Sequence, residues 1–203
     1  MKKLLFVLVS ALSLIFSVNA QNSAVEADAM NNVTKAEKFL KESTFYREDT
    51  YVEMEETGIR AWAKVATDLK TGEKIGYCYF MTESKLALAM FTQETEGGAS
   101  QPLGYLDMDE IDDMIKALKK IVEITRTKSP NDYSINYITK SGIDVFYDSE
   151  EKKVTYSKEW SYVNQYGVRG TYRITSPVAS INAVKKTIAM LEQAKIIINQ
   201  NLK

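Results

Sequence analysis

The stretch Leu106–Thr125, LDMDEIDDMIKALKKIVEIT, decides the fold because it predicts one long helix between two strand-rich segments. Its apolar residues recur at the i, i+3, i+4, i+7 spacing of a helix with a single buried face. They are Met108, Ile111, Met114, Ile115, Leu118, Ile121 and Val122. Asp107 precedes the first turn and Glu110 follows three residues later, which predicts a capping box at the N-terminus of this helix.

Strands are predicted before this helix, where apolar and polar residues alternate with a period of two. The expected strands are Asp49–Glu56, Gly58–Leu69, Ile75–Met81, Leu86–Gln93 and a short one at Leu103–Leu106. Residues 94–104 contain two adjacent glycines and Pro102, and they predict a surface loop. Apolar residues at helical spacing also predict an amphipathic helix from about Glu26 to Lys41.

Four more strands are predicted after the central helix, at Tyr133–Thr139, Ile143–Asp148, Lys153–Val163 and Gly167–Thr175. Ser176-Pro177 then predicts the start of a final helix that reaches about Gln200, because serine suits the N-cap and proline suits the first helical position. The expected fold class is α+β, with a helix at the N-terminus and two antiparallel β-meanders, each followed by an amphipathic helix. The repeated order suggests a diverged internal duplication. In element order alone it is similar to the doubled saddle of TATA-binding-protein-like folds, a similarity that implies nothing about DNA.

The first 20 residues predict a signal peptide. Lys2 and Lys3 precede an apolar run from Leu4 to Val18, and the sequence Val18-Asn19-Ala20 fits the small-x-small rule for cleavage before Gln21. We therefore expect an exported protein, periplasmic or extracellular, with no stable membrane insertion after cleavage.

Removing 20 of the 203 residues leaves a mature chain of 183, enough for a domain with a sizeable core. We expect residues 21–126 and 133–203 to be the two halves of one compact unit. The loss of Lys2 and Lys3 leaves 24 basic residues against 27 acidic ones, a net charge of −3. Such a balance gives no long-range attraction for nucleic acid, so we expect no nucleic-acid partner.

The sequence lacks the residues of several common active sites. It contains no histidine, which excludes Ser-His-Asp and Cys-His catalysis and imidazole metal ligands. Its single cysteine, Cys78, is expected to be a small buried core residue and cannot form a thiolate zinc site alone. The acidic run at residues 107–113 lacks the glycine of a calcium loop and is expected to serve the helix N-terminus. We expect no metal and no cofactor.

Aromatic residues are the unusual feature, since seven of the 12 tyrosines lie between Tyr133 and Tyr172. On the predicted strand Lys153–Val163 one face carries a lysine among three aromatic side chains, namely Tyr156, Lys158, Trp160 and Tyr162. Aromatic residues on strands often form core, but a lysine is rarely fully buried. We therefore expect this face to reach solvent near Lys158. Trp62 is a second exposed-aromatic candidate, and stacking beneath Arg60 and Lys64 is its structural alternative.

The leading functional hypothesis is a non-enzymatic binding or interaction module that uses an aromatic-rich sheet face or groove. Its partner would be a protein, a small molecule or a glycan, and its candidate binding residues are Tyr156, Lys158, Trp160, Tyr162 and Trp62. One alternative is a carboxylate-dependent hydrolase of an extracellular polymer, in which Glu53, Glu55 or Glu56 faces a second carboxylate at ~5–10 Å. A second alternative is a carrier of an apolar ligand, with the helices standing off the sheet.

Overall fold

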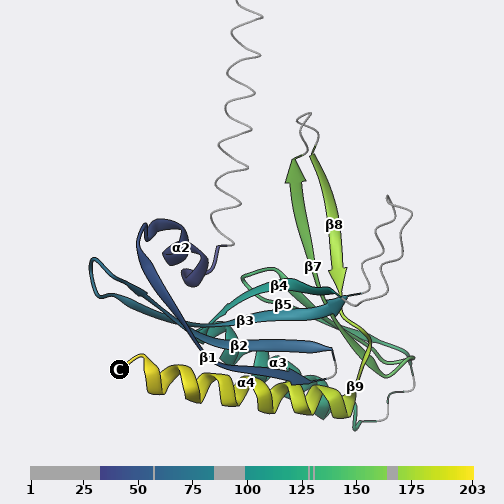
Figure 1. Ribbon diagram of the computed structural model, residues 1–203. Helices are drawn as coiled ribbons and strands as arrows, with labels where there is room; N and C mark the ends of the chain where they lie inside the picture. The colour runs from purple at the N-terminus through teal and green to yellow at the C-terminus, as the bar shows by residue number, and fades with distance from the viewer. Residues whose placement is uncertain (1–32, 57, 85–98, 128, 130, 164–168) are drawn as a thin grey trace, which may run out of the picture. The chain divides into compact units, whose positions relative to one another are not determined.

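The computed structural model describes residues 33–56, 58–84, 99–127, 129, 131–163 and 169–203 (Figure 1). Residues 34–203 form one compact unit. The predicted signal peptide, residues 21–32 and the predicted strand Leu86–Gln93 lie outside the described residues. The order of elements is α2 (Lys35–Glu42), β1 (Tyr46–Glu56), β2 (Ile59–Asp68), β3 (Lys74–Ser84), β4 (Ala99–Asp107), α3 (Met108–Ile124), β5 (Ser134–Ile138), β6 (Ile143–Asp148), β7 (Lys153–Val163), β8 (Arg169–Thr175), β9 (Ala179–Ser180) and α4 (Ile181–Asn201).

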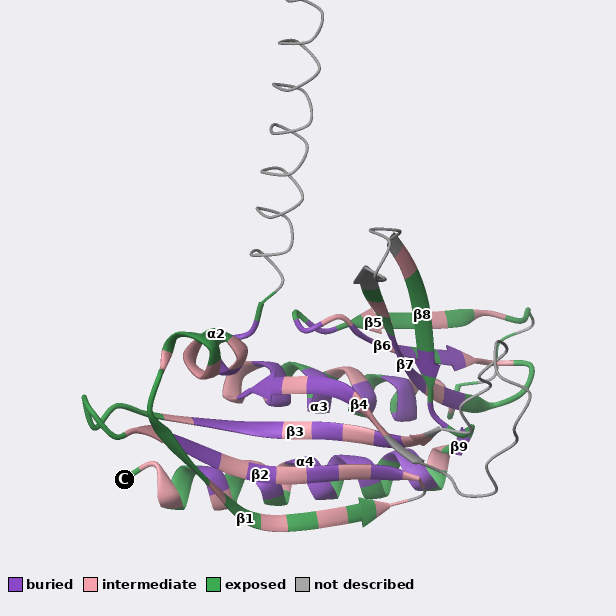
Figure 2. Cartoon of the chain, turned by 45° about the horizontal axis from the view of Figure 1, so that its top comes forward, coloured by how far each residue is buried: buried purple, intermediate pink, exposed green. Residues whose placement is uncertain are grey.

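The first sheet is an antiparallel meander in the order β1-β2-β3-β4. On β2 the buried residues Ile59, Ala61 and Ala63 alternate with partly exposed ones, as the period of two predicts. The colours of Figure 2 show this alternation along β2. One face of the sheet is therefore apolar and must be covered, and the other carries polar and aromatic side chains.

Strand β4 corrects the prediction of a surface loop through residue 104, because Ala99–Asp107 pairs with β3 throughout. Pro102 fits there since β4 is an edge strand of its sheet, where a missing N–H breaks no interior ladder. The register shifts opposite Phe80 and Met81, where Gly104 and Pro102 are the partners and Leu103 is the additional residue of a β-bulge. Leu103 points into the core with no exposed surface.

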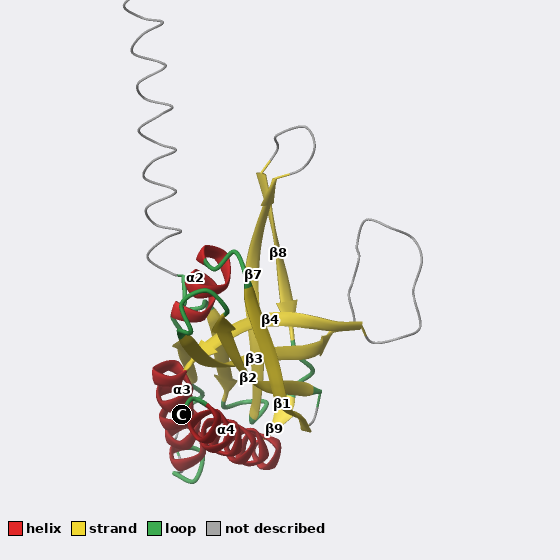
Figure 3. Cartoon of the chain, turned by 60° about the vertical axis from the view of Figure 1, so that its left-hand side comes forward, coloured by secondary structure: helices red, strands yellow, loops and turns green. Residues whose placement is uncertain are grey.

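The second sheet has the order β5-β6-β7-β8, and β9 also pairs with β7. The predicted strands Ile143–Asp148 and Lys153–Val163 agree with β6 and β7 at both ends. β6 and β9 flank the first part of β7, whereas β8 pairs with its second part. β7 and β8 form a long hairpin that extends beyond the other strands in Figures 1 and 3.

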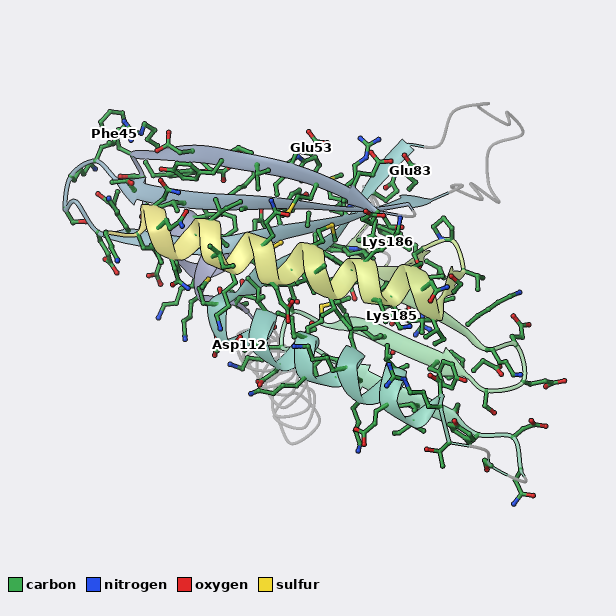
Figure 4. The ribbon with its side chains drawn as sticks, turned by 90° about the horizontal axis from the view of Figure 1, so that it is seen from below. Phe45, Glu53, Glu83, Asp112, Lys185 and Lys186 are labelled. Atoms are coloured by element: carbon green, nitrogen blue, oxygen red, sulfur yellow. The ribbon has the colours of Figure 1, made fainter. Side chains whose placement is uncertain are left out.

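The helices cover the two faces of the first sheet differently (Figure 1). α4 runs along the apolar face, where a Cβ on Gly76 of β3 would lie 2.2 Å from an Ile198 methyl group, so only glycine fits. α2 packs on the opposite face against Ala66 and Tyr77. α3 lies beside α4, as Figure 4 shows from the α4 side.

One hydrophobic core joins both halves of the chain. It contains Phe80 and Leu103 of the first sheet, Leu118 of α3, Tyr156 of the second sheet and Leu191 of α4, each with 0% exposed surface. The α+β class, the antiparallel meanders and the helix after each meander are therefore confirmed. The suggested duplication remains a prediction.

The start of the last helix was predicted wrongly. Ser176 pairs with β7, because its N–H donates to the Tyr156 carbonyl at 2.7 Å and its Oγ accepts from the Tyr156 N–H at 2.9 Å. The chain then continues along β7 as β9, and Ser180 is the N-cap of α4, with its Oγ accepting from the Ala183 N–H at 3.3 Å.

The predicted helix Glu26–Lys41 is also corrected at its described part. Thr34 has an extended backbone (φ −67°, ψ 160°) and caps α2, so no helix continues through it. Among the described residues, no helix is both long enough and apolar enough to span a membrane.

Candidate functional site

The face of the first sheet opposite α4 carries three aromatic rings in a line, which we call the aromatic row. Trp62 on β2, Tyr79 on β3 and Tyr105 on β4 are direct cross-strand partners. The ring centroids of Trp62 and Tyr79 lie 5.6 Å apart at an interplanar angle of 18°, and those of Tyr79 and Tyr105 lie 4.9 Å apart. All three side chains are partly exposed, and the ring of Tyr105 is tilted by 44° against that of Tyr79, so only Trp62 and Tyr79 are stacked.

Arg60 borders the row on β2 and is held by three carboxylates. Its guanidinium lies 3.0 Å from Glu55, 3.1 Å from Glu83 and 3.8 Å from Glu53, counted between the nearest nitrogen and oxygen atoms. Glu53 and Glu83 are labelled on the sheet in Figure 4. The structural alternative for Trp62, stacking under Arg60 and Lys64, is replaced by stacking on Tyr79.

Lys64 borders the row on its other side. Its Nζ forms an ion pair with Glu48 and lies 5.6 Å from the Tyr79 ring centroid. The Glu48 carboxylate also accepts a hydrogen bond from the Tyr77 hydroxyl. Burial raises the pKa of Tyr77, and the bond to Glu48 adds to this effect. Lys64 and Glu48 compensate each other, whereas Arg60 compensates only one of the three carboxylates around it, so acidic charge is in excess beside this strip of uncharged rings.

A shallow depression of about 330 Å³ lies over this strip, lined by Thr50, Trp62, Lys64, Tyr79 and Met81. Phe39 and Leu40 of α2, like Tyr79 and Tyr105, pack against a small buried cluster that includes Tyr77. Burial raises the pKa of Tyr105 to about 12, so its hydroxyl is neutral at physiological pH. The depression thus presents ring faces flanked by hydroxyl, carboxylate and ammonium groups.

The candidate residues on β7 do not lie on this surface. Tyr156 has 0% exposed surface, and its ring meets the edge of Phe80 at a centroid distance of 5.9 Å. Tyr156 is therefore a core residue. Tyr162 belongs to the described part of β7, but its side chain lies outside the described residues.

The expectation that the β7 face reaches solvent near Lys158 is wrong, because only 8% of Lys158 is exposed. Its Nζ lies 4.1 Å from the centroid of the half-buried Trp160 ring and 3.0 Å from the position of a Cβ on Gly104. A side chain at position 104 would displace the ammonium, so the glycine of the β4 bulge makes room for it. Burial lowers the pKa of Lys158, and the charges of Glu37 and Glu110 partly oppose this.

Two acidic residues at the N-terminus of α3, Asp107 and Glu110, have structural roles as hydrogen-bond acceptors. The Asp107 carboxylate accepts from the backbone N–H groups of Lys35 and Ala36, at 2.6 and 2.9 Å, and so caps α2. Glu110 accepts from the N–H groups of Asp107 and Ser141, at 3.1 and 2.9 Å. Burial raises the pKa of Glu110, although these two hydrogen bonds act in the opposite direction.

The structure brings together Trp62, which the sequence singled out, with Tyr79 and Tyr105, which it did not. Tyr77 and Tyr79 alternate with Cys78 and Phe80, and this alternation marks a second aromatic face on β3. Tyr105 could not be found from the sequence, because its place beside Tyr79 follows only from the register between β3 and β4. Cys78 is buried as expected, and burial raises the pKa of its thiol to about 12.

No group of three or more Cys, Asp or Glu side chains able to hold a metal ion occurs among the described residues. No protein-family model matches the chain, and no match was found among curated proteins or solved structures.

Proposed function

We propose that this protein is an exported, non-enzymatic binding module that holds sugar rings on the aromatic row of its first sheet. The observation that carries the proposal is the line of contacting rings of Trp62, Tyr79 and Tyr105, the first two of them stacked, on a partly exposed sheet face. The C–H faces of a sugar ring are apolar and pack on aromatic faces, whereas its hydroxyl groups need donors and acceptors at the side.

The groups beside the row match this second requirement. Glu48 and Lys64 lie on one side of Trp62, and Arg60 with its carboxylates lies on the other. Each cation is already paired, and the excess carboxylates can accept hydrogen bonds from the hydroxyl groups of a neutral ligand. The depression of about 330 Å³ also has the size of a small-ligand site.

The hydrolase alternative gains no support from these carboxylates. Glu53 and Glu55 share the guanidinium of Arg60 with Glu83, so both are already partners in an ion-pair cluster. Burial raises the pKa of Glu110, but both of its carboxylate oxygens already accept hydrogen bonds from backbone N–H groups. These groups are explained as hydrogen-bond acceptors and caps. The hydrolase and the apolar carrier therefore remain alternatives and are not proposed.

The test is affinity electrophoresis of the mature chain, residues 21–203, in gels that contain soluble polysaccharides, followed by titration with the best oligosaccharide. Trp62→Ala is expected to weaken binding at least about tenfold, because Trp62 has the largest ring of the row and lines the depression together with Tyr79. Binding of the sugar should also quench the fluorescence of Trp62.

Phe146→Ala is the matched control, since Phe146 is an exposed aromatic residue of the second sheet, outside the aromatic row. It should bind as tightly as the unchanged protein. The proposal is overturned if no polysaccharide retards the protein, or if Trp62→Ala with an unchanged circular dichroism spectrum binds as the wild type does.

A further inference from the structure

A second site is suggested by an open cleft of about 580 Å³ that shares no residue with the aromatic row. The cleft lies where the end of α3, the start of β5, the β6–β7 turn and the first turns of α4 meet. Arg126, Lys152 and Lys185 line it, against the single carboxylate of Asp132 among its described lining residues. The cleft is thus positive in a chain whose formal net charge is −1.

Among the residues that the structure describes, these three cations have no counter-ion. Several other surface lysines are paired, for example Lys119 with Glu192 at 2.6 Å and Lys186 with Glu56 at 3.0 Å. Within the described ranges no ion pair involves Arg126, Lys152 or Lys185, and the Lys185 Nζ only approaches the Asn182 amide oxygen at 3.4 Å. Lys185 projects from the beginning of α4 toward α3 (Figure 4). Their charges are therefore available to an anion.

Lys152 is held in a backbone conformation that favours glycine. Its φ of 54° makes it the one non-glycine residue with a positive φ in the described part of the chain. The turn before it is fixed by the Asp148 Oδ1, which accepts from the N–H groups of Glu150 and Glu151 at 2.8 and 3.2 Å. A lysine there costs stability that glycine would not, and such strain clusters at functional sites.

The remaining walls add a second positive source and an apolar surface. Ile181, the first residue of α4, lines the cleft, and the first turn of α4 carries no acidic side chain to offset the helix dipole. The half-buried ring of Tyr133 forms the tyrosine wall, and Tyr147, only 2% exposed, supports it from the core with ring centroids 6.0 Å apart and an interplanar angle of 49°. A ligand that fits has an anionic end and a ring.

We infer that this cleft binds a small ring-containing molecule that carries a phosphate or sulfate ester. Arg126, Lys152 and Lys185 hold the anionic group, since a tetrahedral oxyanion accepts hydrogen bonds from several cations at once. The tyrosine wall holds the ring. A volume of about 580 Å³ suits a ligand of this size.

The test is isothermal titration of the full mature chain with glucose 6-phosphate, inorganic phosphate, inorganic sulfate and unmodified glucose. Glucose 6-phosphate should bind at least about tenfold more tightly than inorganic phosphate, because it also contacts the tyrosine wall, and glucose should not bind. Arg126→Gln and Lys152→Gly should each weaken this binding about tenfold or more. Lys152→Gly should not lower the melting temperature, because glycine adopts the positive φ without strain.

Lys153→Gln is the matched control, because it removes the same charge from the next residue, which is not among those lining the cleft. It should leave binding within about twofold of the wild type. Equal losses in Lys152→Gly and Lys153→Gln would mean nonspecific attraction and overturn the inference. So would the absence of binding, or equal affinity for glucose 6-phosphate and inorganic phosphate. Trp62→Ala should bind the phosphate ester normally, which separates this site from the aromatic row.

Discussion

At the scale of single residues, Lys158 shows how a charge inside the fold acts on stability. Burial lowers its pKa below the usual 10.5. Between the folded and unfolded pKa values the folded protein binds fewer protons than the unfolded chain. The stability associated with this group is thus complete above about pH 10.5 and is lost as the pH falls through the folded pKa. At neutral pH the charge of Lys158 opposes folding, and its contact with Trp160 offsets only part of this.

Lys158→Met should therefore stabilise the protein at pH 7, by about 1–3 kcal/mol, since methionine has a similar volume and no charge. The gain should shrink as the pH approaches 10.5, where the lysine loses its proton in both states. Urea unfolding of the two proteins at pH 7 and pH 10 measures this difference. A variant that is less stable at pH 7 would show that the contact with Trp160 outweighs the desolvation of the ammonium.

The sequence pattern of β7 correctly placed Tyr156, Lys158 and Trp160 on one face. It could not show whether that face points to the core or to solvent. Period two assigns side chains to a common face without saying which face is covered. The rule that lysine avoids burial failed because Gly104, 54 positions earlier in the chain, leaves the space for the ammonium. Such a contact depends on how two sheets meet.

At the scale of elements, α2 depends on a side chain far away in the sequence. It has eight residues, which is too short for an isolated helix in water. The Asp107 carboxylate, at the N-cap of α3, accepts its first two backbone N–H groups. One carboxylate thus joins the N-termini of two helices. The local capping box of Thr34 and Glu37 provides the remaining caps at the N-terminus of α2.

Asp107→Ala should therefore loosen α2 before the rest of the fold. Leaving two buried amides without an acceptor costs about 1–3 kcal/mol. Amide hydrogen exchange should accelerate at Lys38, whose N–H donates to Thr34 within α2, and stay slow in the middle of α3. Asp113→Ala, at an exposed position of the same helix, serves as the control. Unchanged exchange at Lys38 would contradict a dependence of α2 on Asp107.

The boundaries of the central helix followed from the sequence, because its apolar period and its Asp107–Glu110 box agree. The beginning of α4 did not. Ser176-Pro177 and Ser180 are both acceptable caps by composition. Ser176 is already paired with Tyr156 of β7, so the helix begins after the later serine, Ser180. Local sequence patterns contain no information on such pairing.

At the scale of the whole molecule, the sequence supplied the order of elements and the alternation of strands with helices. The contact between the two sheets at Gly104, Ser141 and Ile143 could not be predicted from the sequence, because it joins residues from separate halves of the chain. The aromatic row was predictable at Trp62 alone, since its other members depend on the register of three strands.

The predicted export of the chain has a direct test. Lys2, Lys3 and the apolar run before Ala20 predict a signal peptide that is removed. Intact-mass measurement of the natively expressed protein should show a chain that begins at Gln21. An Ala20→Gln variant should slow this cleavage, because the protease requires a small residue there. A full-length mature form in the cytoplasm would contradict the prediction.

The shared carboxylate of Asp107 also bears on the order in which the protein acquires its structure. α2 lies near the beginning of the chain but receives its cap from a residue about 70 positions later, at a sequence separation of 72 for Lys35. A contact that closes so long a loop forms late, once β4 and α3 exist to present the carboxylate. If the chain crosses a membrane with its N-terminus first, α2 arrives before the carboxylate that caps it and acquires that cap only after α3 has followed. The beginning of the chain then stays unfolded, and so able to pass through a translocation channel, until the central helix has crossed the membrane.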